Sequence, residues 1–360
     1  MKNDKEIMVM SDYRIIAPLG KGGNCEAYLA EYGEEKRKVT VKKCREIDGE
    51  VSAGIKKNME TEARILSGLN HRSIPKFIEK SGNTIVLEYM PGDSLETVLL
   101  KRGAVKEKEA ARIAKDLAEI LRYLHGRREP VIYRDLKPAN IVISEEGKVS
   151  LIDFGAARYY KPYERSDTVN LGTMGFAAPE QFGNLGQTDP RTDIYCLGMT
   201  LLQMVSGVNT QDAEAVTRYK QNGVKGISPE FMSIIRKCTS PDRDDRFKSA
   251  KEIMIALDNY PKRVRKRGFR KAVKALAAAF FISVLVAGAV AHSESTSALA
   301  YEYGEMAKDI AIKDANERLP QVKLRFSYAR TRIEEYLKDR GLIIDEKEKE
   351  KIIMERASEQ

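Results

Sequence analysis

The stretch YRDLKPAN (residues 133–140) decides the fold, together with the DFG that follows it at residues 153–155. The carboxylate of Asp135 can accept the proton of a hydroxyl group or orient that hydroxyl, and Lys137 can neutralise a charged group in transfer. Asn140 and the aspartate of DFG supply oxygen atoms of the kind that Mg²⁺ prefers. This order of residues predicts a site for a magnesium-bound phosphate compound beside a hydroxyl group.

Toward the N-terminus lies the glycine-rich stretch LGKGGNCEAY (residues 19–28). Glycines in a turn let backbone N–H groups approach phosphates, although such a turn by itself is most often only a turn. VTVK then ends in Lys42 on a β-type run, and Glu62 follows in the helical pattern METEARILSGL. A strand lysine held by a helix glutamate can bind phosphates, whereas an isolated pair is more often two solvated charges. The order of these motifs favours the phosphate site.

Toward the C-terminus the sequence continues with GTMGFAAPE (residues 172–180), TDIYCLG (residues 192–198) and DRDDRF (residues 242–247). Any one of these short motifs, or DFG alone, would be expected by chance. The complete set of motifs in this order would not be expected by chance.

With these motifs, residues 11–260 resemble the eukaryotic-type (Hanks-type) protein kinases. The layout of residues 1–360 resembles the single-pass transmembrane serine/threonine kinases of bacteria. The resemblance implies an α+β fold with two lobes, a β-rich N-terminal lobe and a helical C-terminal lobe, with ATP between them. It implies transfer of the γ-phosphoryl group of ATP to Ser or Thr of protein substrates, with Mg²⁺ or Mn²⁺ as the metal. Lys137, two residues after Asp135, is typical of the Ser/Thr class.

The resemblance also assigns roles to individual residues. Asp135 would be the base, Lys137 would assist it, and Lys42 would contact the phosphates while paired with Glu62. Leu87 would lie behind the adenine, and Arg134 would meet a phosphate on the activation segment. The remaining assignments are nucleotide contacts (Leu19, Gly20, Lys21, Gly22, Gly23, Ala27, Lys42, Glu88, Met90, Asn140, Asp153), metal ligands (Asn140, Asp153), the activation segment (Ser166, Thr168, Thr173, with Thr168 as the first autophosphorylation site) and structural positions (Glu180 paired with Arg246, and Asp193 bracing the catalytic loop). For Arg246, an ordinary surface arginine is a nearly equal alternative.

Two residues depart from the family pattern. Cys25 stands where the third glycine of the glycine-rich motif is expected, which predicts a slower or weaker ATP clamp. Its thiol could be oxidised or alkylated, although a small residue tolerated in a loop is the simpler interpretation. Tyr133 stands where His is usual, and we expect the aromatic ring to pack behind the site.

The four cysteines (Cys25, Cys44, Cys196, Cys238) lack the spacing of zinc ligands. We expect reduced thiols in a reducing compartment, mostly as small buried side chains.

The pattern of apolar residues gives the expected elements. Residues 11–90 are expected to form mainly strands with one helix, and the regions near 105–125 and 190–260 to form mainly helices. Lys38–Lys43, Thr84–Tyr89 and Ile141–Ile152 are rich in β-branched residues, as strands are.

The excess positive charge is local. The formal net charge is +9, yet residues 261–274, PKRVRKRGFRKAVK, contain eight Lys or Arg and no acid. The sequence therefore does not indicate a protein surface that is positively charged throughout, as nucleic-acid binding would favour, and we expect no nucleic-acid partner. This basic strip is expected to bind anionic lipid, or else to be a solvated run of charge that stops translocation.

Residues 275–291, ALAAAFFISVLVAGAVA, form an uncharged apolar run that follows the basic strip. Seventeen residues make about 26 Å of helix against a bilayer core of about 30 Å, so the run predicts a short membrane-spanning helix. A buried core helix is the less favoured alternative. Because basic residues precede the run, residues 1–271 are expected in the cytoplasm and the C-terminus outside the cell membrane. The expected parts are an N-terminal extension (1–10), a kinase domain (11–260), a basic juxtamembrane segment (261–274), a transmembrane helix (275–291) and an outer segment (292–360).

The outer segment is expected to form two or three amphipathic helices or to be partly disordered, and it could bind a ligand or pair with a second chain as a homodimer. Two alternatives to the kinase stay open. The first is a membrane-tethered pseudokinase, a nucleotide-gated scaffold, which only Cys25 favours. The second is transfer of phosphoryl groups to small molecules, which would not need residues 172–180 or Arg246.

Overall fold

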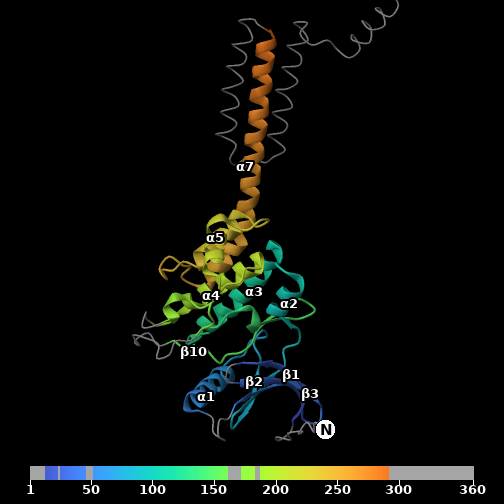
Figure 1. Ribbon diagram of the computed structural model, residues 1–360, viewed down its shortest axis with the longest axis vertical. Coiled ribbons are helices and arrows are strands. Elements are labelled where there is room, and N and C mark those ends of the chain that lie inside the picture. Colours follow the sequence, from blue (N-terminus) through green and yellow to red (C-terminus); the bar gives the residue numbers. More distant parts are fainter. Residues whose placement is uncertain (1–12, 23–24, 46–51, 161–171, 183–186, 292–360) are drawn as a thin grey trace, which may run out of the picture. The chain divides into compact units, whose positions relative to one another are not determined.

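The computed structural model describes residues 13–22, 25–45, 52–160, 172–182 and 187–291 (Figure 1). For residues 271, 275 and 279–291 the backbone alone is described. The chain divides into two compact units, Met1–Pro261 and Lys262–Gln360.

The N-terminal lobe of the first unit is a five-stranded antiparallel sheet with one helix beside it (Figure 1). Residues with β-branched and aromatic side chains build the core of this sheet, because their alternate positions face inward along each strand. Val39, Val41 and Val86 are at most 2% exposed. The elements are β1 (Tyr13–Lys21), β2 (Cys25–Tyr32), β3 (Arg37–Cys44), β4 (Phe77–Ser81), β5 (Thr84–Glu88) and α1 (Ala53–Ser67), with strand order β1-β2-β3-β5-β4.

The C-terminal lobe is mainly helical, and its short strands form a two-stranded sheet (β10-β7) and a three-stranded sheet (β6-β8-β9) (Figure 1). Its helices are α2 (Leu95–Arg102), α3 (Glu107–His125), α4 (Pro190–Ser206), α5 (Ala213–Asn222), α6 (Pro229–Cys238) and the beginning of α7 (Ala250–Ala291). Its short elements are β6 (Asp93–Ser94), β7 (Val131–Ile132), β8 (Ile141–Ile143), β9 (Val149–Leu151), β10 (Arg158–Tyr159) and the 3₁₀ helices η1 (Pro138–Asn140) and η2 (Pro179–Gln181). The predicted division into a β-rich and a helical lobe is confirmed.

Helices α3 and α4 form the centre of the C-terminal lobe. The apolar stripe of α3 that the sequence predicts is buried, with Ile113, Leu117 and Leu124 at 0% exposure. Helix α4 begins after Asp189, whose carboxylate accepts a hydrogen bond from the backbone N–H of Arg191. Gly198 lets α4 approach the end of α6, since a Cβ there would lie 2.5 Å from the Cβ of Cys238. These contacts fix the position of α4 in the C-terminal lobe.

One predicted strand differs from the structure. The stretch Ile141–Ile152 forms two strands, β8 and β9, rather than one. The turn between them contains Gly147 at φ 80°, and the backbone N–H of Gly147 donates to the carbonyl of Ser144. The polar residues EEGK at 145–148 therefore interrupt the β-branched run.

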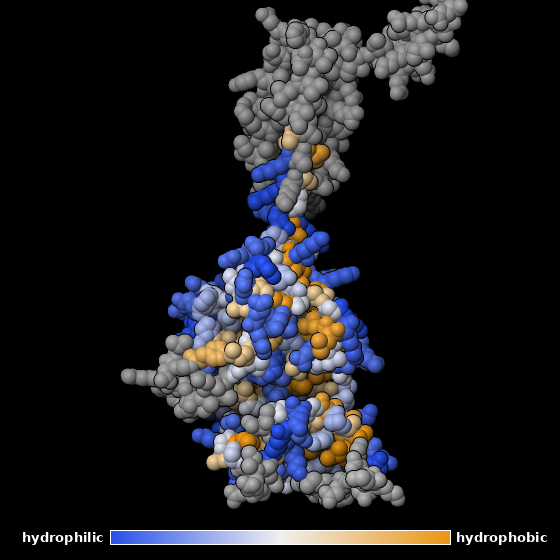
Figure 2. Space-filling view, viewed as in Figure 1, coloured by the Kyte–Doolittle hydropathy of each residue, from blue (hydrophilic) through white to orange (hydrophobic). Residues whose placement is uncertain are grey.

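The second unit is described only through the later part of α7. Lys262, Arg263, Arg265, Lys266, Arg270 and Lys274 are exposed on this helix, and hydrophilic side chains gather along it in Figure 2. Among the residues whose side chains the structure describes, no helix has both the length and the apolar character needed to cross a membrane. The N-terminal extension and the outer segment predicted from the sequence lie outside the described residues.

Candidate active site

The catalytic loop lies between β7 and β8, and its backbone is hydrogen-bonded to Asp193 of α4. The buried carboxylate of Asp193 accepts hydrogen bonds from the backbone N–H groups of Tyr133, at 2.9 Å, and Arg134, at 2.7 Å. Arg134 has φ 70°, a left-handed conformation that costs a non-glycine residue about 1 kcal/mol or more. The two hydrogen bonds therefore stabilise a strained turn that presents Asp135. This is the bracing position that the resemblance gave to Asp193.

Three side chains meet at the carboxylate of Asp135. Thr173 donates its hydroxyl proton to Oδ1 at 2.7 Å, while Asn140 Nδ2 lies 2.9 Å and Lys137 Nζ 2.9 Å from Oδ2. Lys137 Nζ also donates to the Thr173 hydroxyl at 2.6 Å. Residues from two separate segments thus orient one carboxylate and place an ammonium group beside it.

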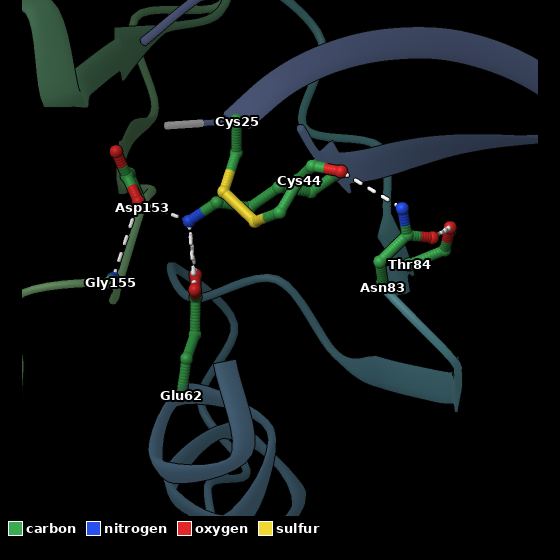
Figure 3. The surroundings of a disulfide bond; sticks show 8 residues. Cys25, Cys44, Glu62, Asn83, Thr84, Asp153 and Gly155 are labelled. Carbon is green, nitrogen blue, oxygen red and sulfur yellow. Dashed lines mark hydrogen bonds and ion pairs between the residues drawn. A yellow bond between two sulfur atoms is a disulfide. The ribbon is translucent and has the colours of Figure 1, made fainter. Parts of the chain in front are cut away.

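Lys42 of β3 lies between the carboxylates of Glu62 and Asp153, both of which are labelled in Figure 3. Its Nζ donates to both oxygens of Glu62 on α1, at 2.7 and 2.8 Å, and to Asp153 Oδ1 at 2.6 Å. Burial alone would lower the pKa of Lys42, but the charges of Glu62 and Asp153 outweigh it and raise the pKa above the usual value of a lysine. The ammonium group therefore stays protonated. The ion pair expected between Lys42 and Glu62 is present.

Asp153 lies next to this pair and is the first residue of the DFG motif. Desolvation alone would raise its pKa, but the Lys42 ammonium outweighs this effect and holds the pKa below the usual value of an aspartate. A Cβ on Gly155 would lie 3.2 Å from both Asp153 Oδ1 and Lys42 Nζ, closer than ordinary contacts. Glycine at this position therefore leaves the room that the ion pair occupies.

The donor atoms fit a magnesium ion bound to phosphates. The backbone N–H of Ile152 donates to the carbonyl of Asn140 at 2.9 Å, which ties the segment that carries Asn140 to the one that carries Asp153. Asn140 Nδ2 is engaged with Asp135, so its Oδ1 is the atom able to bind a cation. Asp153 has a side chain that is 48% exposed and an ionised carboxylate. One amide oxygen and one carboxylate leave room for the water and phosphate ligands that Mg²⁺ retains.

Behind the site, Tyr133 packs as the sequence predicts. It is 0% exposed, its ring meets that of Phe154 edge to face at 5.1 Å, and its hydroxyl donates to the carbonyl of Ile152. The aromatic residue therefore supports the DFG segment from within the core.

The expected nucleotide contacts come from β1, β2 and the end of β5. Gly20 and Lys21 end β1, and Ala27 of β2 lies directly opposite Lys42 of β3. Glu88 ends β5, preceded by the buried Leu87. Leu19 is 45% exposed, and Gly22 and Met90 also lie within the described residues.

Three of the predicted site residues, Gly23, Ser166 and Thr168, lie outside the described residues. The predicted contact of Arg134 with a phosphorylated activation segment therefore stays a prediction. In the structure Arg134 Nε donates to the carbonyl of Ala156 at 2.6 Å.

Glu180 and Arg246 form a buried ion pair in the C-terminal lobe. Arg246 NH1 and NH2 lie 2.8 and 3.0 Å from the two carboxylate oxygens of Glu180, and both side chains are at most 4% exposed. Arg246 also donates to the backbone carbonyls of Ser240, Pro241 and Arg191. The pair expected from the resemblance is present, and the alternative of a surface arginine is wrong.

The expectation of four reduced thiols is wrong for two of the cysteines. Cys25 and Cys44 form a disulfide, whereas Cys196 and Cys238 are free and buried as predicted. The reason is the register of the sheet: Cys25 of β2 and Cys44 of β3 lie directly opposite each other. Nothing in a separation of 19 residues shows that register in advance.

Two further residues at the site were missed by the sequence analysis. His125, at the end of α3, places Nε2 2.8 Å from Asp193 Oδ2. Gln181 donates through Nε2 to the carbonyl of Arg134 at 2.9 Å. The signal for His125 was available, because it is one of only three histidines and ends a strongly amphipathic helix. Gln181 directly follows the APE motif and had no such signal.

Comparison with known proteins agrees with this geometry. Residues 13–257 match the family described as protein kinase domain. The chain is 30% identical over 277 residues to the serine/threonine-protein kinase PknA of Nostoc, a match of 70% of this chain and 48% of that protein. It is 34% identical over 206 residues to the serine/threonine-protein kinase pkn2 of Myxococcus xanthus, a match of 54% and 24%. It is 29% identical over 266 residues to a probable serine/threonine-protein kinase of Clostridium perfringens, a match of 69% and 38%. The chain thus spans less than half the length of these relatives. It belongs to the protein kinase family, with a kinase domain similar to those of bacterial serine/threonine kinases.

Proposed function

We propose that the chain is an ATP-dependent protein kinase that transfers the γ-phosphoryl group to Ser or Thr of proteins. The observation that carries this proposal is the connected set from Lys42 and Glu62 through Asp153 and Asn140 to Asp135. An ammonium group for phosphates, two oxygen ligands for a metal and one carboxylate for a hydroxyl lie along this set. These are the parts that phosphoryl transfer requires.

In this proposal the substrate hydroxyl takes the place of the Thr173 hydroxyl at Asp135 Oδ1 or shares that oxygen with it. The hydroxyl oxygen forms a bond to the γ-phosphorus, the bond from that phosphorus to the β–γ bridging oxygen breaks, and ADP leaves with the electron pair. The hydroxyl proton passes to Asp135 and then to solvent. Lys137, 2.9 Å from Asp135, offsets negative charge on the phosphoryl group in transfer. Asp153 and Asn140 would hold Mg²⁺, which neutralises the charge of the phosphates.

The test of this function is transfer of label from γ-labelled ATP to a generic protein substrate, followed by analysis of the labelled amino acid. We expect phosphoserine and phosphothreonine that depend on added Mg²⁺. A protein that binds Mg-ATP without transferring label would be a pseudokinase scaffold. Label on small acceptors alone would indicate a small-molecule phosphotransferase.

We also propose that the kinase phosphorylates its own activation segment, first at Thr168. The buried Arg134 beside Asp135 supports this, because a phosphate on the segment can form charge-assisted hydrogen bonds with an arginine. Mass spectrometry of the peptide 156–178 after incubation with Mg-ATP should show phosphate on Thr168 before Ser166. The variant Thr168→Ala should lose activation while Ser166→Ala keeps it. An unmodified peptide in a fully active enzyme contradicts this proposal.

We further propose that residues 275–291 anchor the chain in the cell membrane, with the kinase domain in the cytoplasm and the C-terminus outside. The uncharged run of 17 residues and the eight preceding basic residues support this topology and contact with anionic lipid. The full chain should stay with membranes after alkaline carbonate washing. The double variant Ile282→Lys/Leu285→Lys should be released, because each charge at a helix centre costs about 3 kcal/mol. The matched pair Arg265→Gln/Arg270→Gln should stay bound. Release of the unaltered chain by carbonate contradicts the anchor.

A further inference from the structure

The Cys25–Cys44 disulfide lies at the glycine-rich turn. Cys25 is the first residue of β2 and directly follows this turn, and Cys44 is the last residue of β3. The backbone N–H of Gly22 donates to the carbonyl of Cys25 at 2.8 Å. The disulfide therefore ties the second arm of the turn covalently to β3, at the position where the family pattern has a glycine.

The disulfide lies on the face of the sheet that carries the phosphate-binding lysine. Side chains two residues apart on a strand share a face, so Cys44 shares a face with Lys42 of β3. On β2, Cys25 shares a face with Ala27, which lies opposite Lys42. Figure 3 shows the two sulfur atoms beside the hydrogen bonds that end on Glu62 and Asp153. A change in this disulfide is thus a change at the nucleotide site.

The two ends of the disulfide differ in exposure and support. Cys44 is 1% exposed, and Asn83 holds its backbone on both sides: Cys44 N–H donates to the Asn83 carbonyl, and Asn83 Nδ2 donates to the Cys44 carbonyl, each at 2.9 Å. Cys25 is half-buried. Cys25 is thus the more accessible end of the disulfide for an external thiol, and breaking the disulfide leaves Cys44 held by Asn83 while Cys25 loses its covalent bond to β3.

We propose that Cys25 and Cys44 form a reversible thiol–disulfide modification site that sets the ATP affinity of the kinase; the inference rests on the proposed function. A thiolate of a dithiol reductant attacks the Cys25 sulfur, and Cys44 leaves as a thiolate that takes up a proton. The second thiol of the reductant then displaces Cys25, so two electrons and two protons pass to the protein and the reductant becomes a disulfide. A small disulfide such as oxidised glutathione drives the reverse exchange. We have proposed that the kinase domain lies in the cytoplasm, and disulfides in such reducing compartments are usually catalytic or redox-sensing.

The disulfide weakens the clamp on the nucleotide. Cys25 begins the part of β2 that lies opposite Lys42, and a start of β2 that is bonded covalently to β3 as well as paired with it cannot shift to fit the phosphates. The reduced protein regains the movement and binds Mg-ATP more tightly.

The test uses the full chain equilibrated with either dithiothreitol or oxidised glutathione. Alkylation and mass spectrometry of the peptides that contain Cys25 and Cys44 report the thiol state, and calorimetry with Mg-ADP reports affinity without turnover. Reduction should lower the KM for ATP and the Kd for Mg-ADP about fivefold, with kcat changed less than twofold. Cys25→Ala and Cys44→Ala should each show the low values in both conditions. Cys238→Ala, which removes a buried thiol in α6, should respond as the unaltered chain does.

Equal KM and Kd values in the two conditions overturn the inference. So does a Cys44→Ala variant that still responds, or a pair of cysteines that stays in one thiol state under both conditions. A protein that transfers no phosphate in either state, yet binds Mg-ADP with a redox-dependent Kd, would refute the proposed function and leave the modification site in place.

Discussion

Replacing Asp135 with Asn is expected to lower kcat about 10³-fold while the Kd for Mg-ATP changes less than about twofold, since removal of a general base typically costs 10² to 10⁴ in rate. Asn keeps the size of the side chain but cannot accept the hydroxyl proton. Lys42, Asp153 and Asn140, which would hold the nucleotide and the metal, remain in place. Single-turnover transfer of label and calorimetry on the same preparation measure the two quantities.

The matched control is Asp116→Asn, an isosteric change on α3 at a side chain that is 40% exposed and pairs with Arg112. It should leave kcat unchanged. If Asp135→Asn keeps a tenth or more of the kcat of the unaltered enzyme, Asp135 is not the base and the assignment of the catalytic loop is wrong.

Replacing Arg246 with Met is expected to lower the free energy of unfolding by about 3 to 5 kcal/mol, because it leaves the carboxylate of Glu180 buried without its cation. The partners that remain to Glu180 include the Thr192 hydroxyl, at 2.8 Å, which is neutral. Arg246 also joins the segment after α6 to the start of α4 through its hydrogen bonds to the carbonyls of Pro241 and Arg191. Urea unfolding followed by circular dichroism measures the change.

The control lies two residues away. Lys248→Met alters a side chain that is 57% exposed and pairs with the exposed Asp244, so the expected change is below about 1 kcal/mol. If Arg246→Met does not fold, the double variant Glu180→Met/Arg246→Met removes both charges and should recover much of the loss. A single variant within 1 kcal/mol of the unaltered chain, or a double variant less stable than the single, contradicts this account.

Most of the site could be predicted from the sequence because its residues lie in short contiguous motifs. In YRDLKPAN the separation of Asp135, Lys137 and Asn140 is short, so the local chain geometry alone brings their side chains together. The pairs Lys42–Glu62 and Glu180–Arg246 span 20 and 66 residues, and only the resemblance to a known family connected them. Burial explains why Arg246 is no ordinary surface arginine, and burial cannot be seen in the letters DRDDRF.

The parts that were not predicted depend on register and on packing between distant elements. The disulfide required Cys25 and Cys44 to be opposite each other in the sheet, and a shift of one residue would have turned the two thiols to different faces. The contact of His125 with Asp193 required the end of α3 to meet the start of α4. The interaction of Thr173 with Asp135 required the segment that begins at Gly172 to lie beside the catalytic loop. None of these is encoded in a local pattern.

The central claim is that one magnesium-bound nucleotide contacts residues from both lobes at once. The most direct measurement is a crystal structure of the full chain with Mg²⁺ and a non-hydrolysable ATP analogue. The account predicts Lys42 Nζ on the α- or β-phosphate, Asp153 and Asn140 as ligands of the same metal cluster, and Asp135 within reach of a hydroxyl at the γ-phosphate. A nucleotide bound elsewhere, or Lys42 and Asp135 facing separate ligands, would contradict it.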